Sequence, residues 1–164
     1  MVKNPYDKMA PIESTLFVHL KPEEVYSFLD ARESHLKFIP RMTHLDQNSA
    51  GAFGQAGTIL SGMLNYFGIR IPVQYEIIDV EPNRMLAMKG RMGPILFKDG
   101  YSLKKVEAGT EIKFWLELLP TGWAKVISPF MGVIGKIHAW ETLRNLKREL
   151  MKNEIASSRR GGKG

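Results

Sequence analysis

Apolar and polar residues alternate along most of the chain between residues 43 and 119. A period of two is typical of strands with one buried face, and turn signals rich in Gly, Pro and Asn divide the region. The predicted strands span residues 43–46, 57–66, 70–81, 84–91, 95–106 and 110–119. A β-branched and apolar segment at 14–20 predicts one earlier strand. Because every later connection is short, we expect an antiparallel meander.

Helical patterns flank these strands. Residues 21–24 (Lys-Pro-Glu-Glu) place a proline and two acids where the first turn of a helix favours them. A second short helix fits residues 34–39, capped by Ser34 and stopped by Pro40. The last helical segment, 123–155, has a break at Pro129 and alone is long enough to cross a sheet.

The predicted fold is therefore α+β, in the order β-α-α-β-β-β-β-β-β-α. A curved antiparallel seven-stranded sheet wraps around a long C-terminal helix, with any hollow between the two. The length of 164 residues predicts one domain, 13–156, between an N-terminal arm, 1–12, and a disordered basic tail, 157–164.

Composition narrows the function classes. The absence of cysteine excludes disulfides, thiolate metal sites and a cysteine nucleophile. The net charge is +6, but three of the 23 basic side chains lie in the tail, which leaves 20 basic against 17 acidic side chains elsewhere. This weak excess argues against a nucleic-acid partner. The sequence shows neither a signal peptide nor a spanning segment, so we expect a cytoplasmic protein.

Four segments carry a family resemblance: residues 21–30, 79–86, 109–114 and 143–150. In this order and spacing, the chain resembles the polyketide cyclase/dehydrase and lipid-transport superfamily over residues 13–154. These helix-grip proteins include the birch-pollen-allergen-like and the steroidogenic-acute-regulatory-related lipid transfer domains. The resemblance implies a cavity for a hydrophobic small molecule. It does not imply one activity, because members include carriers, sensors and cyclases.

One face of the predicted sheet carries aromatic and flexible aliphatic side chains. These residues could fill an ordinary core, but with the resemblance they predict a ligand cavity. The turn at 66–68 adds aromatic residues at a candidate portal. The predicted ligand-binding residues from the strands and the last helix are Tyr75, Met88, Phe97, Tyr101, Phe114, Leu116, Gly132, Gly135 and Ala139.

Asp99 is the one carboxylate that alternation places among the inward aromatic residues. A buried carboxylate needs a partner or a raised pKa, as functional acids often have. Alternatively, a bulge at Gly100 would turn Asp99 outward. If Asp99 faces inward, it and Tyr101 are the candidate catalytic residues for proton transfer, and the best polar pair for orienting a ligand.

The last helix has two apolar faces. One face contains Leu143, Leu146 and Leu150. Toward the start of the helix, the same face continues through Ala139, Gly135 and Gly132. The other is the stripe formed by Phe130, Val133, Ile137 and Trp140. If the helix is straight, this stripe faces solvent and contacts a membrane, a second subunit or the strand loops. If it kinks near Gly132 or Gly135, the stripe turns inward. We expect a kink or local cover, because exposed stripes are uncommon on monomers.

Metal and cofactor sites are not predicted. His138 and Glu141 have i,i+3 spacing on a helix, but one such pair leaves a transition metal short of ligands. We interpret them as a surface pair. No dinucleotide-binding, phosphate-binding or nucleophile-elbow motif is present.

Three functions remain in order of preference. The first is a non-enzymatic protein that binds or carries a lipid, isoprenoid or polyketide-like molecule. The second is a polyketide aromatase/cyclase that uses a cavity acid. The third is a membrane-docking accessory subunit that uses the stripe and the basic tail; a homodimer through the stripe is also open.

Overall fold

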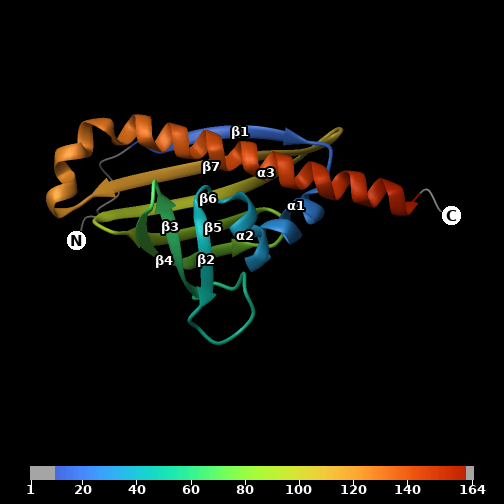
Figure 1. Cartoon of the computed structure of the whole chain (residues 1–164). Coiled ribbons are helices and arrows are strands. Elements are labelled where there is room, and N and C mark those ends of the chain that lie inside the picture. The colour runs from blue at the N-terminus through green and yellow to red at the C-terminus, as the bar shows by residue number, and fades with distance from the viewer. Residues whose placement is uncertain (1–9, 162–164) are drawn as a thin grey trace.

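The computed structural model of the chain describes residues 10–161 (Figure 1). Within them the elements follow the predicted order. The strands are β1 (Ile12–Val18), β2 (Met42–Gln47), β3 (Ile59–Tyr66), β4 (Ile69–Glu81), β5 (Met85–Met92), β6 (Ile95–Val106) and β7 (Gly109–Pro120). The helices are α1 (Pro22–Leu29), α2 (Arg32–Phe38), the 3-10 segment η1 (Gly122–Phe130) and α3 (Met131–Gly161).

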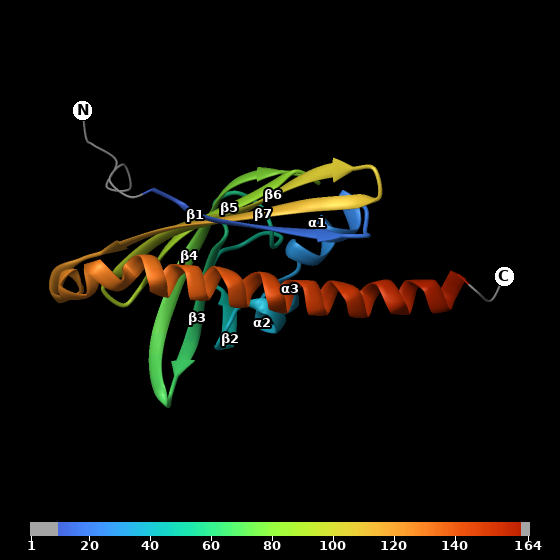
Figure 2. The same cartoon turned by 90° about the horizontal axis from the view of Figure 1, so that it is seen from above.

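The seven strands form one antiparallel sheet in the order β1-β7-β6-β5-β4-β3-β2. The meander from β2 to β7 pairs each strand with the next, and β1 closes the order by pairing with β7. Seen from above, the sheet curves around one side of α3, and the β3–β4 hairpin projects past the helix (Figure 2). α3 packs against β1, β7 and α2. The predicted α+β helix-grip architecture is confirmed.

The core lies between the concave face of this sheet and the helices. In β7 the apolar residues Ile112, Phe114, Leu116 and Leu118 are buried and alternate with half-buried charged residues and Trp115. The same period of two continues on β4, where Val73, Tyr75 and Ile77 are buried. Alternation therefore identified the concave face, because a strand with one buried face must keep its apolar residues in phase.

α3 is one continuous helix with its small residues against the sheet. Gly135 and Ala139 are buried, and a side chain on Gly135 would collide with Ile12 and Leu118. This close approach lets the helix lie flat on β1 and β7. Gly132, in contrast, is exposed and a side chain there would meet nothing.

The predicted kink is wrong. Pro129 lies inside the 3-10 segment, which ends at Phe130, and the α-helix begins at Met131, so the break comes before most of the stripe. The opposite side of a flat helix must then face outward. Phe130, Val133, Ile137 and Trp140 keep 51 to 63% of their surface exposed.

The helix boundaries differ from prediction at two places. α2 begins at Arg32 after the extended residue Ala31, and Ser34 is buried inside the helix instead of capping it. α3 continues to Gly161, so the first five residues of the predicted tail are helical. A hydrogen bond of 3.0 Å from the Ser158 hydroxyl to the Ile155 carbonyl supports this last turn. The rest of the tail and most of the predicted arm lie outside the described residues.

Within residues 10–161, no helix is long and apolar enough to cross a bilayer.

Candidate functional site

A cavity of about 80 Å³ opens on the concave face between the sheet, α3 and the segment around Ile39. Ten of its lining side chains are aliphatic, sulfur-containing or phenylalanine, and four are polar-tipped. The lining residues are Ile39, Met42, Leu64, Tyr66, Val73, Tyr75, Met88, Met92, Phe97, Asp99, Leu116, Leu118, Ile134 and His138. Ligand pockets are more often about 300–1,000 Å³. This cavity is therefore smaller than most ligand pockets.

The residues predicted to bind a ligand divide into two groups. Tyr75, Met88, Phe97 and Leu116 line the cavity. The others lie outside this lining: Tyr101 and Phe114 are buried in the neighbouring core, Gly135 and Ala139 in the contact of α3 with the sheet, and Gly132 is on the surface.

Asp99 lines the cavity, so the outward placement considered from the sequence is wrong. The pairing of β6 with β5 and β7 runs through Asp99 and Gly100 without a register shift. Gly100 serves another purpose. A Cβ atom there would lie 2.6 Å from the ring of Trp115, its partner on β7. The glycine makes room for this indole on the convex face and leaves the alternation of β6 intact.

The carboxyl of Asp99 lies among uncharged groups. Its cross-strand neighbours are Met88 and Leu116, and its buried Oδ1 atom has no hydrogen-bond partner within the described residues. Burial raises the pKa of this carboxyl from 3.8 to about 7. Burial, followed by the nearby Asp99 charge, also raises the pKa of Tyr75 and Tyr101. At pH 6 Asp99 is therefore mostly a neutral acid that can donate a hydrogen bond.

A buried histidine supports Tyr75 from behind. His35 on α2 is fully buried; its Nε2 lies 2.8 Å from the Leu29 carbonyl and its Nδ1 lies 3.1 Å from the Tyr75 hydroxyl. A carbonyl can only accept, so Nε2 carries the proton and Nδ1 accepts from the tyrosine. Burial lowers the pKa of His35 to about 4, which keeps the ring neutral.

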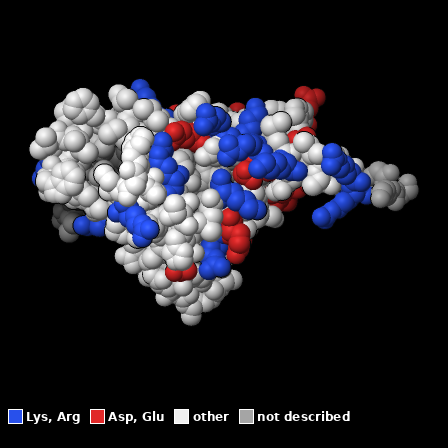
Figure 3. Space-filling view, viewed as in Figure 1, with Lys and Arg blue, Asp and Glu red and all other residues white. Residues whose placement is uncertain are grey.

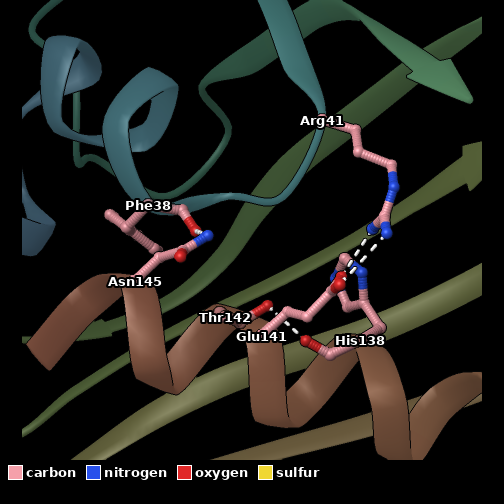
Figure 4. Close-up of polar contacts among 6 residues, drawn as sticks. All are labelled: Phe38, Arg41, His138, Glu141, Thr142 and Asn145. Atoms are coloured by element: carbon pink, nitrogen blue, oxygen red, sulfur yellow. Dashed lines mark hydrogen bonds and ion pairs between the residues drawn. The ribbon is translucent and has the colours of Figure 1, made fainter. Parts of the chain in front are cut away.

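An ion pair joins the residue before β2 to α3, next to the cavity-lining residue His138 (Figure 4). Arg41 Nη1 and Nη2 lie 2.5 and 3.0 Å from the two carboxylate oxygens of Glu141 on α3, and the guanidinium covers the Tyr66 ring at 4.9 Å. Arg41 has a backbone φ of +63°, in the left-handed region that residues other than glycine seldom adopt. Tyr66 and His138 line the cavity beside this pair, so moving α3 outward would separate Arg41 from Glu141.

The interpretation of His138 and Glu141 as a surface pair is wrong. Glu141 binds Arg41, 100 residues away in the sequence, and His138 is one of the residues that line the cavity. Burial lowers the pKa of His138 to about 4, so this ring is also neutral. On the next turn of α3, the Asn145 amide donates to the Phe38 carbonyl at 3.3 Å and ties the helix to α2 (Figure 4).

The four polar-tipped residues of the lining do not form a metal site. Within the described part of the chain, no group of three or more His, Asp or Glu side chains is placed to hold an ion. The arrangement is an apolar hollow whose lining includes one carboxyl, two phenol groups and one imidazole.

Solved structures share this architecture at low sequence identity. Zhui aromatase/cyclase from Streptomyces sp. R1128 is 11% identical, with 87% of this chain and 94% of that chain covered and a TM-score of 0.73. The Ara h 8.0201 structure is 14% identical, with coverages of 87% and 98% and a TM-score of 0.68. A conserved protein from Geobacillus kaustophilus is 15% identical, with coverages of 87% and 96% and a TM-score of 0.69. No family model and no curated protein matches the sequence. These likenesses show the fold.

Proposed function

Because the chain has the helix-grip fold of the polyketide cyclase/dehydrase and lipid-transport superfamily, we propose that it binds and carries an apolar small molecule. Lipid, isoprenoid and polyketide-like molecules are the candidate classes. The observation that supports the proposal is the cavity on the concave face. Ten of its fourteen lining side chains are apolar: nine aliphatic or methionine side chains and one phenylalanine. Burial of ligand surface contributes about 25 cal/mol per Å² before ordering costs.

Access fits the side of the cavity next to the β3–β4 hairpin. Tyr66 ends β3 there, and Ile134 and His138 face it from α3. Phe67 at the hairpin tip is fully exposed, and the Arg41–Glu141 pair spans the same side. Separation of α3 from the hairpin would admit a ligand larger than the closed cavity.

Filling the cavity is expected to abolish uptake of an apolar probe. Val73 is buried in the lining, and Val73→Phe adds a ring to a hollow of about 80 Å³. We expect the affinity for the neutral probe N-phenyl-1-naphthylamine, measured by fluorescence titration, to fall at least about tenfold, or 1.4 kcal/mol. Val106→Phe, a half-buried position outside the lining, is the matched control. Equal affinities in both variants, together with no hydrophobic molecule in native mass spectra of the purified protein, would refute the proposal.

An enzyme is the second candidate, favoured by one observation. Asp99 combines an unpartnered carboxyl oxygen with a pKa raised to about 7, and general acids work best near the operating pH. An aromatase/cyclase-type reaction would use this proton on a polyketide-like chain folded in the cavity. If the Asp99→Asn variant still cyclises a polyketide-like substrate at the wild-type rate, this candidate is excluded.

We also propose that the exposed stripe of Phe130, Val133, Ile137 and Trp140 contacts an anionic membrane. The end of the molecule that carries η1 and the start of α3 is mostly uncharged, and basic side chains gather farther along α3 (Figure 3). Arg144 covers the Trp140 ring at 4.4 Å. An apolar stripe beside cations is typical of helices that lie in a bilayer interface.

Polar substitution of the stripe is expected to release the protein from vesicles. Ile137→Ser with Trp140→Ser removes two side chains that are each more than half exposed. Co-sedimentation with phosphatidylglycerol-containing vesicles should fall at least about fivefold, on the order of 1 kcal/mol. Met151→Ser with Ile155→Ser, which are also exposed on α3, is the matched control. If the first variant instead turns a dimer into a monomer, the stripe is a subunit interface and the membrane proposal is wrong.

A further inference from the structure

The cavity has one polar feature whose hydrogen-bonding capacity is unused within the described residues. The Oδ1 atom of Asp99 is buried and unpartnered, although an unpaired buried polar atom costs about 1–3 kcal/mol. The residue lies on the cavity floor between Met88 and Leu116, which line the same hollow. A ligand that enters this hollow is therefore in position to pair with the carboxyl.

The other polar groups of the lining do not compete for this role. The Tyr75 hydroxyl donates its proton to His35, so it cannot donate to a ligand at the same time. Tyr66 lies under the Arg41 guanidinium, and His138 lies next to the Arg41–Glu141 ion pair. Asp99, when protonated, is thus the hydrogen-bond donor that serves the interior of the cavity.

The charge around Asp99 determines which ligand oxygen it can hold. Its own strand contributes Tyr101, β4 contributes Tyr75, and α3 contributes His138 from across the cavity; all three are uncharged at pH 6. β5 and β7 face it with apolar side chains, and His35, behind Tyr75, is neutral as well. The lining contains no lysine or arginine. With no cation to hold an anionic group, the neutral acid presents an O–H donor in an apolar hollow.

We propose that the ligand is a neutral, mostly apolar molecule with one carbonyl oxygen, and that the Asp99 carboxyl holds this oxygen by donating a hydrogen bond. The inference rests on the proposed binding function and names the chemistry of its ligand. A carbonyl oxygen accepts without carrying charge, so it satisfies the acid without a further partner. A hydrocarbon leaves the acid unpaired, and an anion meets no cation.

Binding of a matched pair of probes tests this assignment. Acetophenone carries the carbonyl, and ethylbenzene has the same ring without it; both are small enough for a narrow cavity. Their affinities are measured by NMR titration of the whole chain at pH 6 and pH 8. We expect acetophenone to bind about tenfold more weakly at pH 8, because the donor proton of Asp99 is lost through a pKa near 7. Ethylbenzene should bind equally at both pH values.

Two substitutions at Asp99 distinguish loss of the hydrogen-bond donor from damage to the fold. Asp99→Asn keeps an N–H donor of similar shape, so acetophenone should bind this variant equally at pH 6 and pH 8. Asp99→Leu removes the donor, so acetophenone should lose its advantage over ethylbenzene at pH 6. Asp79→Asn, exposed on β4 of the same sheet, is the control and should behave as wild type.

The outcomes distinguish this inference from the function on which it rests. If both probes bind and neither affinity depends on pH or on Asp99, the carbonyl assignment is wrong and the apolar cavity stands. Acetophenone binding that tightens as the pH rises would also overturn it, because a carboxylate would then be the group that matters. If neither probe binds, the proposed binding function fails together with the inference.

Discussion

Acidification from pH 6.5 to pH 4 is expected to lower the free energy of unfolding by several kcal/mol. His35 is buried without charge, and its pKa falls from 6.5 to about 4 on folding. The unfolded chain therefore binds a proton below pH 6.5 that the folded chain binds only near pH 4. Stability is complete above pH 6.5 and is lost as the pH falls through this window, on the order of 3 kcal/mol for His35 alone. Burial of His138 acts in the same direction, and Asp99, whose pKa rises on folding, offsets part of the loss.

Urea unfolding followed by tryptophan fluorescence at pH 4.5 and pH 7 measures this loss. The double variant His35→Phe with Tyr75→Phe replaces the hydrogen-bonded pair by apolar rings but leaves the Leu29 carbonyl without its donor. We expect this variant to be less stable than wild type at pH 7, and the difference to narrow by roughly 3 kcal/mol at pH 4.5. His19→Gln, at an exposed position after β1, is the control. A difference that stays constant with pH would show that His35 does not carry the acid sensitivity.

The sheet could be predicted because its strands and turns are determined by residues close together in the sequence. One apolar face gives each strand a period of two, and short turns leave little choice of partner. The placement of Asp99 followed from the same alternation, once the structure excluded a bulge at Gly100. Trp115 explains this glycine, but nothing in the sequence indicates that these two residues lie opposite each other.

The polar contacts around the cavity could not be predicted, because they join distant segments. His35 meets Tyr75 across 40 residues, and Arg41 meets Glu141 across 100. The spacing of His138 and Glu141 favours a surface pair, but helix periodicity alone does not show which face of the helix is covered by other elements. The only local signals were two histidines within predicted helices.

The predicted inward turn of the stripe on α3 is wrong because it rests on a general property of monomers and not on the residues of the helix itself. Exposed apolar stripes are uncommon on monomers, which favoured an inward turn. The small residues Gly135 and Ala139 were the better signal, since they allow the helix to lie directly on Ile12 and Leu118. A helix that presents its small residues to the sheet must present the opposite side to solvent.

Replacement of Asp99 by leucine is expected to stabilise the protein at neutral pH while removing its one interior carboxyl on the cavity floor. The pKa of Asp99 rises from 3.8 to about 7 on folding, so the folded state keeps a proton that the unfolded chain has already released. Wild-type stability from this group is complete below pH 3.8 and is lost as the pH rises through 7, on the order of 4 kcal/mol in total. Leucine has no charge to desolvate and is close in volume.

The difference in unfolding free energy between Asp99→Leu and wild type isolates this effect, because contributions from His35 and His138 are common to both proteins. We expect the difference to grow by about 1.4 kcal/mol for each pH unit between pH 4 and pH 7, and to stay constant above pH 8. Asp79→Asn, exposed on β4, should show no such growth. A pH-independent difference for Asp99→Leu would mean that Asp99 is ionised in the folded protein at pH 6. In the described chain the buried Oδ1 atom of Asp99 has no hydrogen-bond partner, and the proposed ligand carbonyl would pair with this carboxyl.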